Sequence, residues 1–456
     1  MRTALLTLPF LAVAMAAGAA PLPGPQSFEL DNGLTVVVIE DHRAPLAIQM
    51  VWYRVGSADD PAGRSGLAHF LEHLMFKATD ELAEGAFSRI VAENGGSDNA
   101  FTTTDYTAYV QRVAADRLGL VMAMEADRMV DLAPTEPGVL SERDVVLEER
   151  REVVGSDPAA GLAEECQAAL YLNHPYGRPV IGWEQEIAAL TRPVAMDFYR
   201  AHYAPNHAVL VVAGDVGADE VRRLAEEHFG PIPSSPAVAL RQRPQEPPHR
   251  APRRVEMQDA RTGQPFLRRT WLAPSRRTGD QHEAAALAVL ADLLGGSSVT
   301  SVMGRELVLG DGLALDAGAS YSNTGLDGAT FDVYVVPKPG VGFAEAEAAL
   351  DEVLARFVAS GPEPSEMDRI RGRIRASEIY VLDDLMTRAS RVGSALTSGL
   401  TLDDVAAWPG LLQAVTAAEV QAAAASVLRI ESSVTCSLAL PDLPASPAPL
   451  PQGSAP

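Results

Sequence analysis

The sequence is poor in cysteine, in basic residues and, after its first twenty residues, in long apolar runs. Only two of its 456 residues are cysteines, Cys166 and Cys436. Neither lies in a spacing typical of metal-binding cysteines. An exported chain can join two such residues in a disulfide. They lie in different halves of the sequence, however, so we expect free or isolated thiols.

Basic residues are outnumbered by acidic ones. The chain has 37 Lys and Arg against 60 Asp and Glu, which gives a formal net charge of −23. An acidic surface disfavours partners such as nucleic acid and anionic membranes. It would suit basic or neutral peptide substrates, although a charge that keeps the protein soluble is the commoner explanation.

The only long apolar run lies at the start of the chain. Arg2 precedes the apolar residues 5–17, which are too few to span a bilayer, and small residues follow them. This pattern predicts a secretory signal peptide over residues 1–20 and export to the periplasm or beyond. An uncleaved anchor is the alternative. We expect no lipid anchor, because no cysteine lies near the cleavage site, and no membrane span later in the chain.

The pattern of residues 65–77 predicts an amphipathic helix. At 100° per residue, His69, Glu72 and His73 fall on one face. The opposite face is apolar and consists of Leu67, Phe70, Leu71, Leu74 and Met75. Two imidazoles at i and i+4 can hold one divalent metal, most often zinc. The carboxylate between them can take a proton from a water that the metal activates. The order His-x-x-Glu-His is the inverse of the common zincin motif. A helix that carries these residues by chance is the alternative, and a third ligand would decide.

A second predicted helix, residues 141–154, supplies a candidate third ligand. Its N-cap would be Ser141, with Asp144 as the capping-box partner. Glu142 and Glu149 lie two helical turns apart and therefore share one face. The predicted apolar residues of that face are Val145, Val146 and Val153. Carboxylates on an apolar face are costly unless a positive group meets them. A metal with its histidine would do so, and an arginine from elsewhere is the alternative.

These motifs resemble those of the M16 (pitrilysin-type, inverzincin) zinc peptidases, and most closely the processing-peptidase-like members of subfamily B. Further similar stretches lie at residues 52–56, 173–177, 203–206 and 211–215.

The resemblance implies a role for each residue of the two helices. His69, His73 and Glu149 would bind one zinc ion per chain, and Glu72 would act as the general base. Glu142 would support a ligand histidine through a hydrogen bond.

The fold that the resemblance implies is α+β, of the α/β sandwich type. Two homologous domains, each a mostly antiparallel sheet packed with helices, would enclose a chamber. The second half repeats the element order of the first, with a helix at 281–294 in place of the zinc helix and another at 364–387. The expected segments are the signal peptide 1–20, the zinc-binding domain 24–230, a proline-rich linker 231–252, the second domain 253–441 and a disordered tail 442–456.

Two further features concern substrate binding. Residues 99–110 are rich in Thr, Tyr and Phe and predict a strand. In the M16 family this strand is an edge beside the zinc that pairs with extended substrate, and its matching residues here are Asn99, Ala100 and Phe101. An ordinary strand without a ligand is the alternative.

Many active family members also hold the substrate carbonyl with an arginine and a tyrosine from the second half. Arg305 matches the arginine, but Leu315 stands where the tyrosine is expected. Either the chain works without this clamp or a partner chain supplies it.

The sequence therefore predicts a zinc-dependent endopeptidase that hydrolyses short or unfolded peptides in a closed chamber. We expect a homodimer, or a heterodimer with a second M16-type chain. The alternatives are a metal-bearing subunit that needs its partner for turnover, a non-catalytic scaffold, and a protein that captures peptides without cleaving them.

Overall fold

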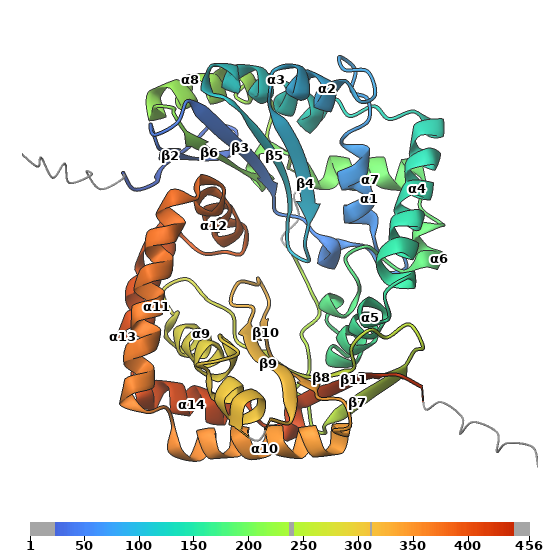
Figure 1. The fold of residues 1–456 in the computed structure, drawn as a ribbon. Helices are drawn as coiled ribbons and strands as arrows, with labels where there is room; N and C mark the ends of the chain where they lie inside the picture. The colour runs from blue at the N-terminus through green and yellow to red at the C-terminus, as the bar shows by residue number, and fades with distance from the viewer. Residues whose placement is uncertain (1–22, 237–240, 311, 442–456) are drawn as a thin grey trace, which may run out of the picture.

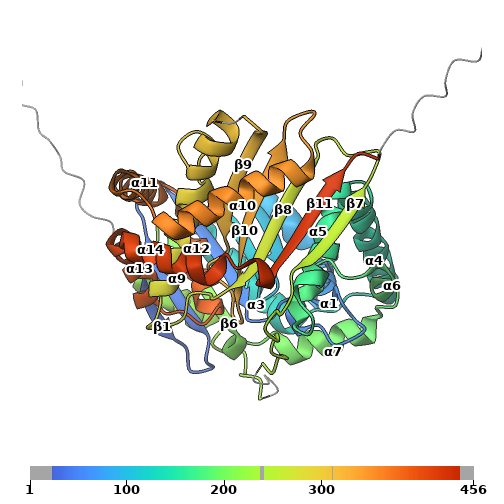
Figure 2. The same ribbon diagram turned by 90° about the horizontal axis from the view of Figure 1, so that it is seen from below.

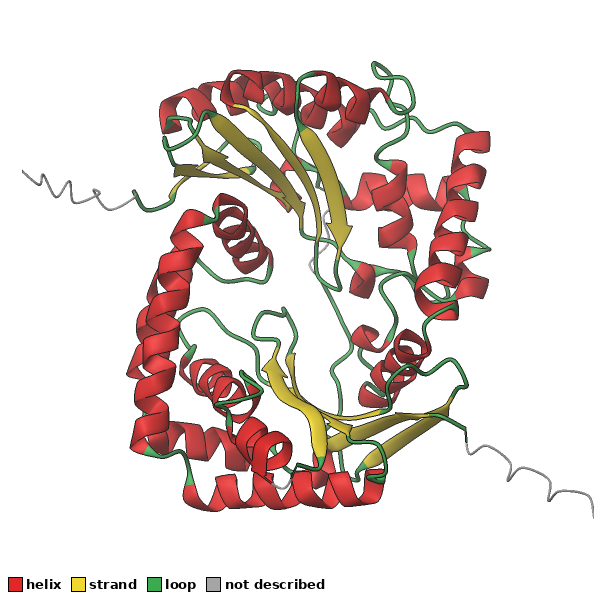
Figure 3. Cartoon of the chain, viewed as in Figure 1, coloured by secondary structure: helices red, strands yellow, loops and turns green. Residues whose placement is uncertain are grey.

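The computed structural model describes residues 23–236, 241–310 and 312–441. The predicted signal peptide, residues 1–20, and the predicted tail, residues 442–456, lie outside the described residues. The fold is α+β, as predicted, and each half of the chain builds one sheet with helices around it (Figure 1 and Figure 3). Among the described residues, no helix combines the length and the apolar character needed to cross a membrane.

The first sheet has the strand order β1-β2-β6-β3-β5-β4. Its strands are β1 (Gln26–Glu29), β2 (Thr35–Glu40), β3 (Leu46–Tyr53), β4 (Ser97–Thr102), β5 (Thr107–Ala114) and β6 (Ala208–Gly214). Only β2 and β6 run parallel. The hairpin turn between β1 and β2 contains Gly33 with a φ of +85°, which glycine adopts without strain. The central strands are buried along nearly their whole length, because helices cover both faces of the sheet.

The second sheet repeats this plan. Its strand order is β7-β11-β8-β10-β9, and only β7 and β11 run parallel. The strands are β7 (Arg253–Gln258), β8 (Phe266–Ala273), β9 (Ala314–Tyr321), β10 (Ala329–Pro337) and β11 (Ser433–Ala439). Each sheet thus has one parallel pair followed by antiparallel neighbours that end at an edge strand, β4 or β9. The predicted repetition of the element order is confirmed.

The helices of the first half are α1 (Leu67–Leu74), α2 (Ala86–Glu93), α3 (Leu118–Val130), α4 (Glu136–Arg150), α5 (Pro158–Leu170), α6 (Glu184–Ile187), α7 (Arg192–His202) and α8 (Ala218–His228). Those of the second half are α9 (His282–Gly295), α10 (Phe343–Ser360), α11 (Pro364–Asp383), α12 (Leu385–Thr397), α13 (Leu402–Ala414) and α14 (Ala417–Val427). Seen from below, α10 crosses the outer face of the second sheet (Figure 2).

The single helix predicted over residues 364–387 is wrong. The chain breaks between α11 and α12 at Asp384, which has extended backbone angles. Its side chain accepts a hydrogen bond from Thr387 N at 3.1 Å and so caps the new helix. The break lets α12 turn toward the other half of the molecule.

Each half contributes one helix to the sheet of the other half (Figure 1). Helix α12 packs against β3 and β6 of the first sheet, and α5 packs against β11, β7 and β8 of the second. Gly393 makes the close approach of α12 possible, because a Cβ at this position would lie 2.0 Å from Cε2 of Trp52. The two halves therefore complete each other's hydrophobic cores.

Cys166 on α5 and Cys436 on β11 form a disulfide, with their Cα atoms 6.3 Å apart. The expectation of free or isolated thiols was therefore wrong. It assumed that residues from different halves of the sequence lie apart, whereas α5 belongs to the covering of the second sheet. Leu162, Leu170 and Leu438 pack around the bond.

Residues 231–236 and 241–252 form no helix or strand, as expected of a linker, but they are tied to both halves. The buried guanidinium of Arg243 pairs with Asp59 at 2.9 Å, Asp105 at 2.5 Å and Asp327 at 2.7 Å. Asp59 and Asp105 belong to the first half, and Asp327 lies between β9 and β10. One arginine thus joins the halves, and removing it would take from the buried Asp105 its ion pair.

Candidate metal centre

The candidate centre starts at the N-terminus of α1. Gly66 precedes the helix with a φ of +84°, and a Cβ there would lie 2.4 Å from the carbonyl oxygen of Ile181. Only glycine fits so close an approach without a shift of the backbone. The side chain of Asp60 accepts hydrogen bonds from Gly66 N and Ala68 N, both at 2.8 Å. Asp60, six residues before Gly66, therefore caps the helix in place of the N-cap side chain that glycine lacks.

Helix α1 buries the apolar face that the sequence predicted. Each of its predicted apolar residues is at most 1% exposed, namely Leu67, Phe70, Leu71, Leu74 and Met75. The opposite face carries His69, Glu72 and His73. Because α1 packs against α4, α7 and β4, this polar face has side chains of other elements within hydrogen-bonding reach.

The helix that faces α1, α4, differs at both ends from the prediction. It begins at Glu136, after Thr135, whose hydroxyl accepts a hydrogen bond from a first-turn backbone N–H at 3.2 Å. The predicted N-cap at Ser141 is therefore wrong, and Pro137 in the first turn is typical of the earlier start. Beyond its last residue, the chain continues in a π-helical segment, Arg151–Gly155.

The predicted apolar face of α4 is wrong in part. Val145 and Val153 are 48% and 51% exposed, and only Val146 is buried. Glu142 and Glu149 do share one face, and it meets the polar face of α1. The two carboxylates contact histidines rather than apolar surface, which removes the cost of burying them without partners.

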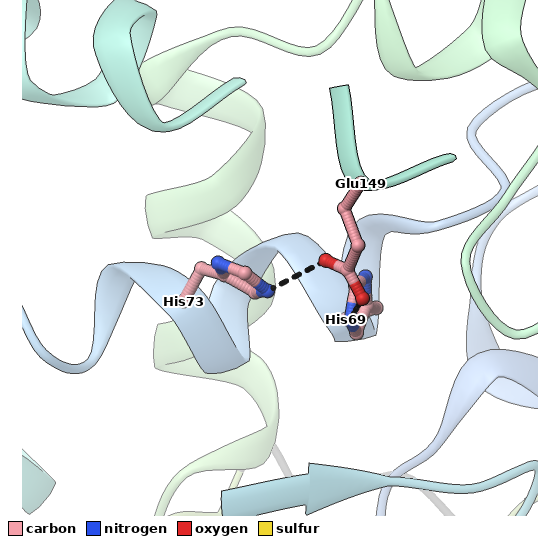
Figure 4. Close-up of side chains that lie close together, drawn as sticks. All are labelled: His69, His73 and Glu149. Atoms are coloured by element: carbon pink, nitrogen blue, oxygen red, sulfur yellow. Dashed lines mark ion pairs between the residues drawn. The ribbon is translucent and has the colours of Figure 1, made fainter. Parts of the chain in front are cut away.

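Figure 4 shows His69 and His73 of α1 and Glu149 of α4 turned toward one another. Nε2 of His73 lies 3.3 Å from Oε2 of Glu149, and Nε2 of His69 lies 3.8 Å from Oε1 of Glu149. One potential ligand atom from each residue lies within 4.8 Å of the other two. Two nitrogens and one carboxylate at this spacing can surround one divalent cation and leave a coordination position open.

Glu142 supports His73 from the side away from this cluster. Its Oε1 lies 2.8 Å from Nδ1 of His73, and its Oε2 lies 2.6 Å from Nζ of Lys77. Burial alone would raise the pKa of Glu142, but His73 and Lys77 outweigh that effect and lower the pKa. The ionised carboxylate accepts the Nδ1–H of His73, which leaves the Nε2 lone pair facing Glu149.

These features fit a bound zinc ion. Within the described residues, the buried Oε2 of Glu149 makes no hydrogen bond. Burial lowers the pKa of His69 to about 3, and the neighbouring His73 adds to the effect. The imidazole of His69 is thus neutral and offers a lone pair. Imidazole nitrogens with one carboxylate are a donor set that zinc takes in catalytic sites.

Glu72 lies between the two histidines in sequence and on the same helix face. Burial raises the pKa of Glu72 above its usual range, against the opposing effect of a hydrogen bond from Thr102. Oγ1 of Thr102 donates that bond to Oε2 of Glu72 at 2.6 Å. A carboxylate whose pKa is raised is a better proton acceptor than an ordinary one, which suits a general base.

The strand predicted over residues 99–110 is two strands, β4 and β5, so its predicted form is wrong. Thr103 and Tyr106 close the turn between them through a backbone hydrogen bond of 2.8 Å. Strand β4 pairs with β5 and forms the edge of the first sheet, as the resemblance implied. Asn99 is exposed, Ala100 packs toward the first core, and the ring of Phe101 packs against other aromatic rings. The outer backbone of β4 is the part that an extended peptide can pair with.

Comparison with known proteins identifies the family. The family model described as Insulinase (Peptidase family M16) matches residues 35–184, and that of the Peptidase M16 inactive domain matches residues 189–374. An uncharacterized zinc protease of Mycobacterium leprae is 34% identical over 369 residues, which cover 80% of each chain. The chain belongs to peptidase family M16.

Solved structures agree with this assignment to family M16. A protease from Helicobacter pylori superimposes with a TM-score of 0.84 and 27% identity over 91% of this chain and 100% of that one. The periplasmic protease PqqL from Escherichia coli shares the fold with a TM-score of 0.79 and 20% identity. That match covers 92% of this chain but 48% of PqqL, so this M16 chain corresponds to half of the longer protein.

Among the described residues, Arg305 contacts its own half of the M16 chain and none of the residues of the metal cluster. Its guanidinium donates a hydrogen bond to the carbonyl oxygen of Thr300 at 2.6 Å and pairs with Glu366. Leu315, at the expected tyrosine position, lies on β9 and is 48% exposed. Both residues make their contacts within the second half, so the described residues do not assemble the clamp expected from the family.

Sequence analysis missed two residues that support the M16 cluster. Lys77 lies one turn beyond His73, and the need of Glu142 for a positive partner was a signal that could have identified it. Thr102 offered no such signal. Its contact with Glu72 depends on the packing of β4 against α1, which no local pattern encodes.

Proposed function

We propose that this M16 chain is a zinc-dependent endopeptidase that cleaves short or unfolded polypeptides. The observation that carries the proposal is the convergence of His69, His73 and Glu149 beside Glu72. Two elements far apart in the sequence, α1 and α4, are needed to build it. A chance motif on one helix would have no reason to meet a matching carboxylate on another.

In this proposal each residue has a defined task. His69, His73 and Glu149 hold the zinc ion, and Glu142 fixes the orientation of His73. When bound, zinc polarises the scissile carbonyl and lowers the pKa of water at its open position. Glu72 takes the proton from the attacking water and returns it to the leaving amine.

The outer edge of β4 supports the substrate class. An extended chain can add to this edge through backbone hydrogen bonds, which a folded protein cannot offer. We propose that substrates are peptides or unfolded segments, aligned by β4 and enclosed between facing halves.

The disulfide supports the proposed location. Disulfides persist in oxidising compartments, which agrees with the signal peptide predicted at residues 1–20 and with export to the periplasm or beyond.

A second candidate is a metal-bearing subunit that turns over substrate only with a partner chain. It is favoured by the engagement of Arg305 with Glu366 and by Leu315 at the expected tyrosine position. The correspondence of this chain to half of PqqL also supports assembly with a second M16-type chain, as a homodimer or a heterodimer.

The deciding experiment is cleavage of a mixed set of unfolded peptides by the purified chain, with zinc content measured in parallel. We expect Glu72→Gln to retain zinc and to lower cleavage by about a hundredfold or more. Glu148→Gln is the matched control, because its side chain is 72% exposed on α4.

Each outcome has a distinct meaning. Cleavage by wild type alone supports a self-sufficient enzyme. Absent cleavage with zinc bound, restored by a second M16 chain, supports the subunit. Equal activity in Glu72→Gln would overturn the assignment of the general base.

A further inference from the structure

A row of hydrogen bonds leads from Glu72 into the first sheet. Oγ1 of Thr102 donates to Oε2 of Glu72 at 2.6 Å and lies 3.2 Å from Oγ1 of Thr107. Oγ1 of Thr107 donates in turn to the carbonyl oxygen of Val55 at 3.1 Å. Thr107 is fully buried and Glu72 is nearly so, which gives these bonds little competition from water.

The direction of each bond follows from counting protons. Each hydroxyl has one proton to donate. That of Thr107 is used on the carbonyl oxygen of Val55, which can only accept. The hydroxyl of Thr102 is therefore free to direct its own proton to the carboxylate of Glu72, with Thr107 behind it as a fixed neighbour.

The two threonines are also fixed by the strand pairing. Thr102 and Thr107 are direct partners in the β4–β5 register, at the end of the hairpin. The adjoining turn is closed by three hydrogen bonds between Thr103 and Tyr106, of 2.8 to 3.1 Å. Neither hydroxyl can shift far without opening this hairpin.

Within the described residues, the protein donates a hydrogen bond to only one oxygen of Glu72, Oε2. The other oxygen, Oε1, remains for the attacking water. A carboxylate held by one oxygen cannot rotate freely about its last bond, so the lone pairs of the second oxygen keep one direction.

We propose that Thr102 is a positioning residue for the general base, with Thr107 as its support. Thr102 belongs to the strand whose outer edge pairs with substrate, so the same strand sets the place of the peptide and the direction of the base. This inference rests on the proposed function.

The test compares Thr102→Val, which removes the hydroxyl at nearly constant shape, with Thr102→Ser, which keeps it. For Thr102→Val we expect kcat to fall about 10- to 100-fold, with KM within about twofold. Zinc content should be unchanged. Thr102→Ser should restore most of kcat, and Thr107→Val should give a smaller loss than Thr102→Val. Thr104→Val is the matched control, since its hydroxyl makes no hydrogen bond to another described residue.

Crystal structures of wild type and Thr102→Val complete the test. We expect the carboxylate of Glu72 to leave its wild-type rotamer only in Thr102→Val. An unchanged kcat, or a Glu72 that keeps its position without the hydroxyl, would overturn the proposal. A wild type that binds zinc but stays inactive even with a second M16 chain would instead overturn the proposed function, and the position of Glu72 would still decide whether Thr102 holds it.

Discussion

Helices α1 and α9 occupy the same place in two sheets of the same plan. In chain order α1 follows β3 and precedes β4, and α9 lies in the same way between β8 and β9. The buried residues of α9 are all alanine, leucine or valine. Helix α1 is shorter, and its face opposite the core carries His69, Glu72 and His73. Within the described residues, the scaffold is thus present twice and the candidate metal cluster once.

The difference between α1 and α9 shows that a histidine motif on a helix forms a metal cluster only with partners from other elements. Buried polar groups lower stability unless each has a partner. Around α1 the partners come from outside the helix, from Glu142 and Glu149 on α4 and from Thr102 on β4. Helix α9 packs against α11, α14 and β9, mainly through hydrophobic residues. Its Asp292 pairs with Arg373 of α11, the helix in the place of α4, and no histidine takes part. The cluster of the first half therefore depends on three elements together, α1, α4 and β4.

The strongest test of this comparison replaces one histidine by alanine in each of the helices α1 and α9. His73→Ala should lose zinc and lower peptide hydrolysis by roughly three orders of magnitude, because the metal and the alignment of the base are lost together. His282→Ala, on the exposed first turn of α9, should leave both within about twofold. Zinc analysis and steady-state cleavage measure the two effects. Zinc loss in His282→Ala would contradict the claim that only the first half carries the cluster.

Helices α5 and α12 allow a second comparison, since a disulfide attaches α5 to the other half whereas noncovalent contacts hold α12, among them an ion pair of Arg388 with Asp41 at 2.8 Å. Cys436→Ser should lower the free energy of unfolding by about 2–4 kcal/mol, because the disulfide restricts the unfolded chain. Urea unfolding of the variant and of oxidised and reduced wild type measures the effect. The variant should match reduced wild type. If oxidised and reduced wild type unfold at the same urea concentration, the disulfide does not form in solution.

The smallest effect concerns the packing of α12. Gly393→Ala should lower the free energy of unfolding by about 1–3 kcal/mol, because its Cβ would overlap the ring of Trp52. Gly410→Ala is the matched control in α13, where a Cβ meets open space, and should stabilise by about 0.5–1 kcal/mol. Thermal unfolding of both variants measures the difference. Equal stability of Gly393→Ala and wild type would mean that α12 does not lie on Trp52.

The parts of the fold that local patterns encode were predicted from the sequence. Periodicity predicted the buried face of α1 and a helix in the place of α9, and the structure has both. The two-turn spacing of Glu142 and Glu149 predicted that they share a face, which they do. Each of these signals lies within one helix or strand.

The failures have a different origin. The capping-box pattern of Ser141 and Asp144 predicts a helix start at Ser141. The helix starts earlier, with Thr135 as its N-cap and Pro137 in its first turn. Asp384 interrupts what reads as one helix, because its side chain caps a new one. The pairing of Cys166 with Cys436 and the contact of Thr102 with Glu72 depend on which elements pack together. No spacing along the chain contains that information.

The exchange of α5 and α12 has a consequence for how the molecule holds together. The two helices stand at matching points of their repeats, each after the pair of helices that follows β5 or β10. Each half thus gives one helix to the other half and receives one in return. This is the geometry of a domain-swapped dimer, here with its two copies fused into one polypeptide. A half cut out at residues 231–252 would leave its sheet without one covering layer and would expose the valines of β2 and β6 or the apolar face of β11. The smallest unit that can fold cooperatively is therefore the whole pseudo-symmetric pair.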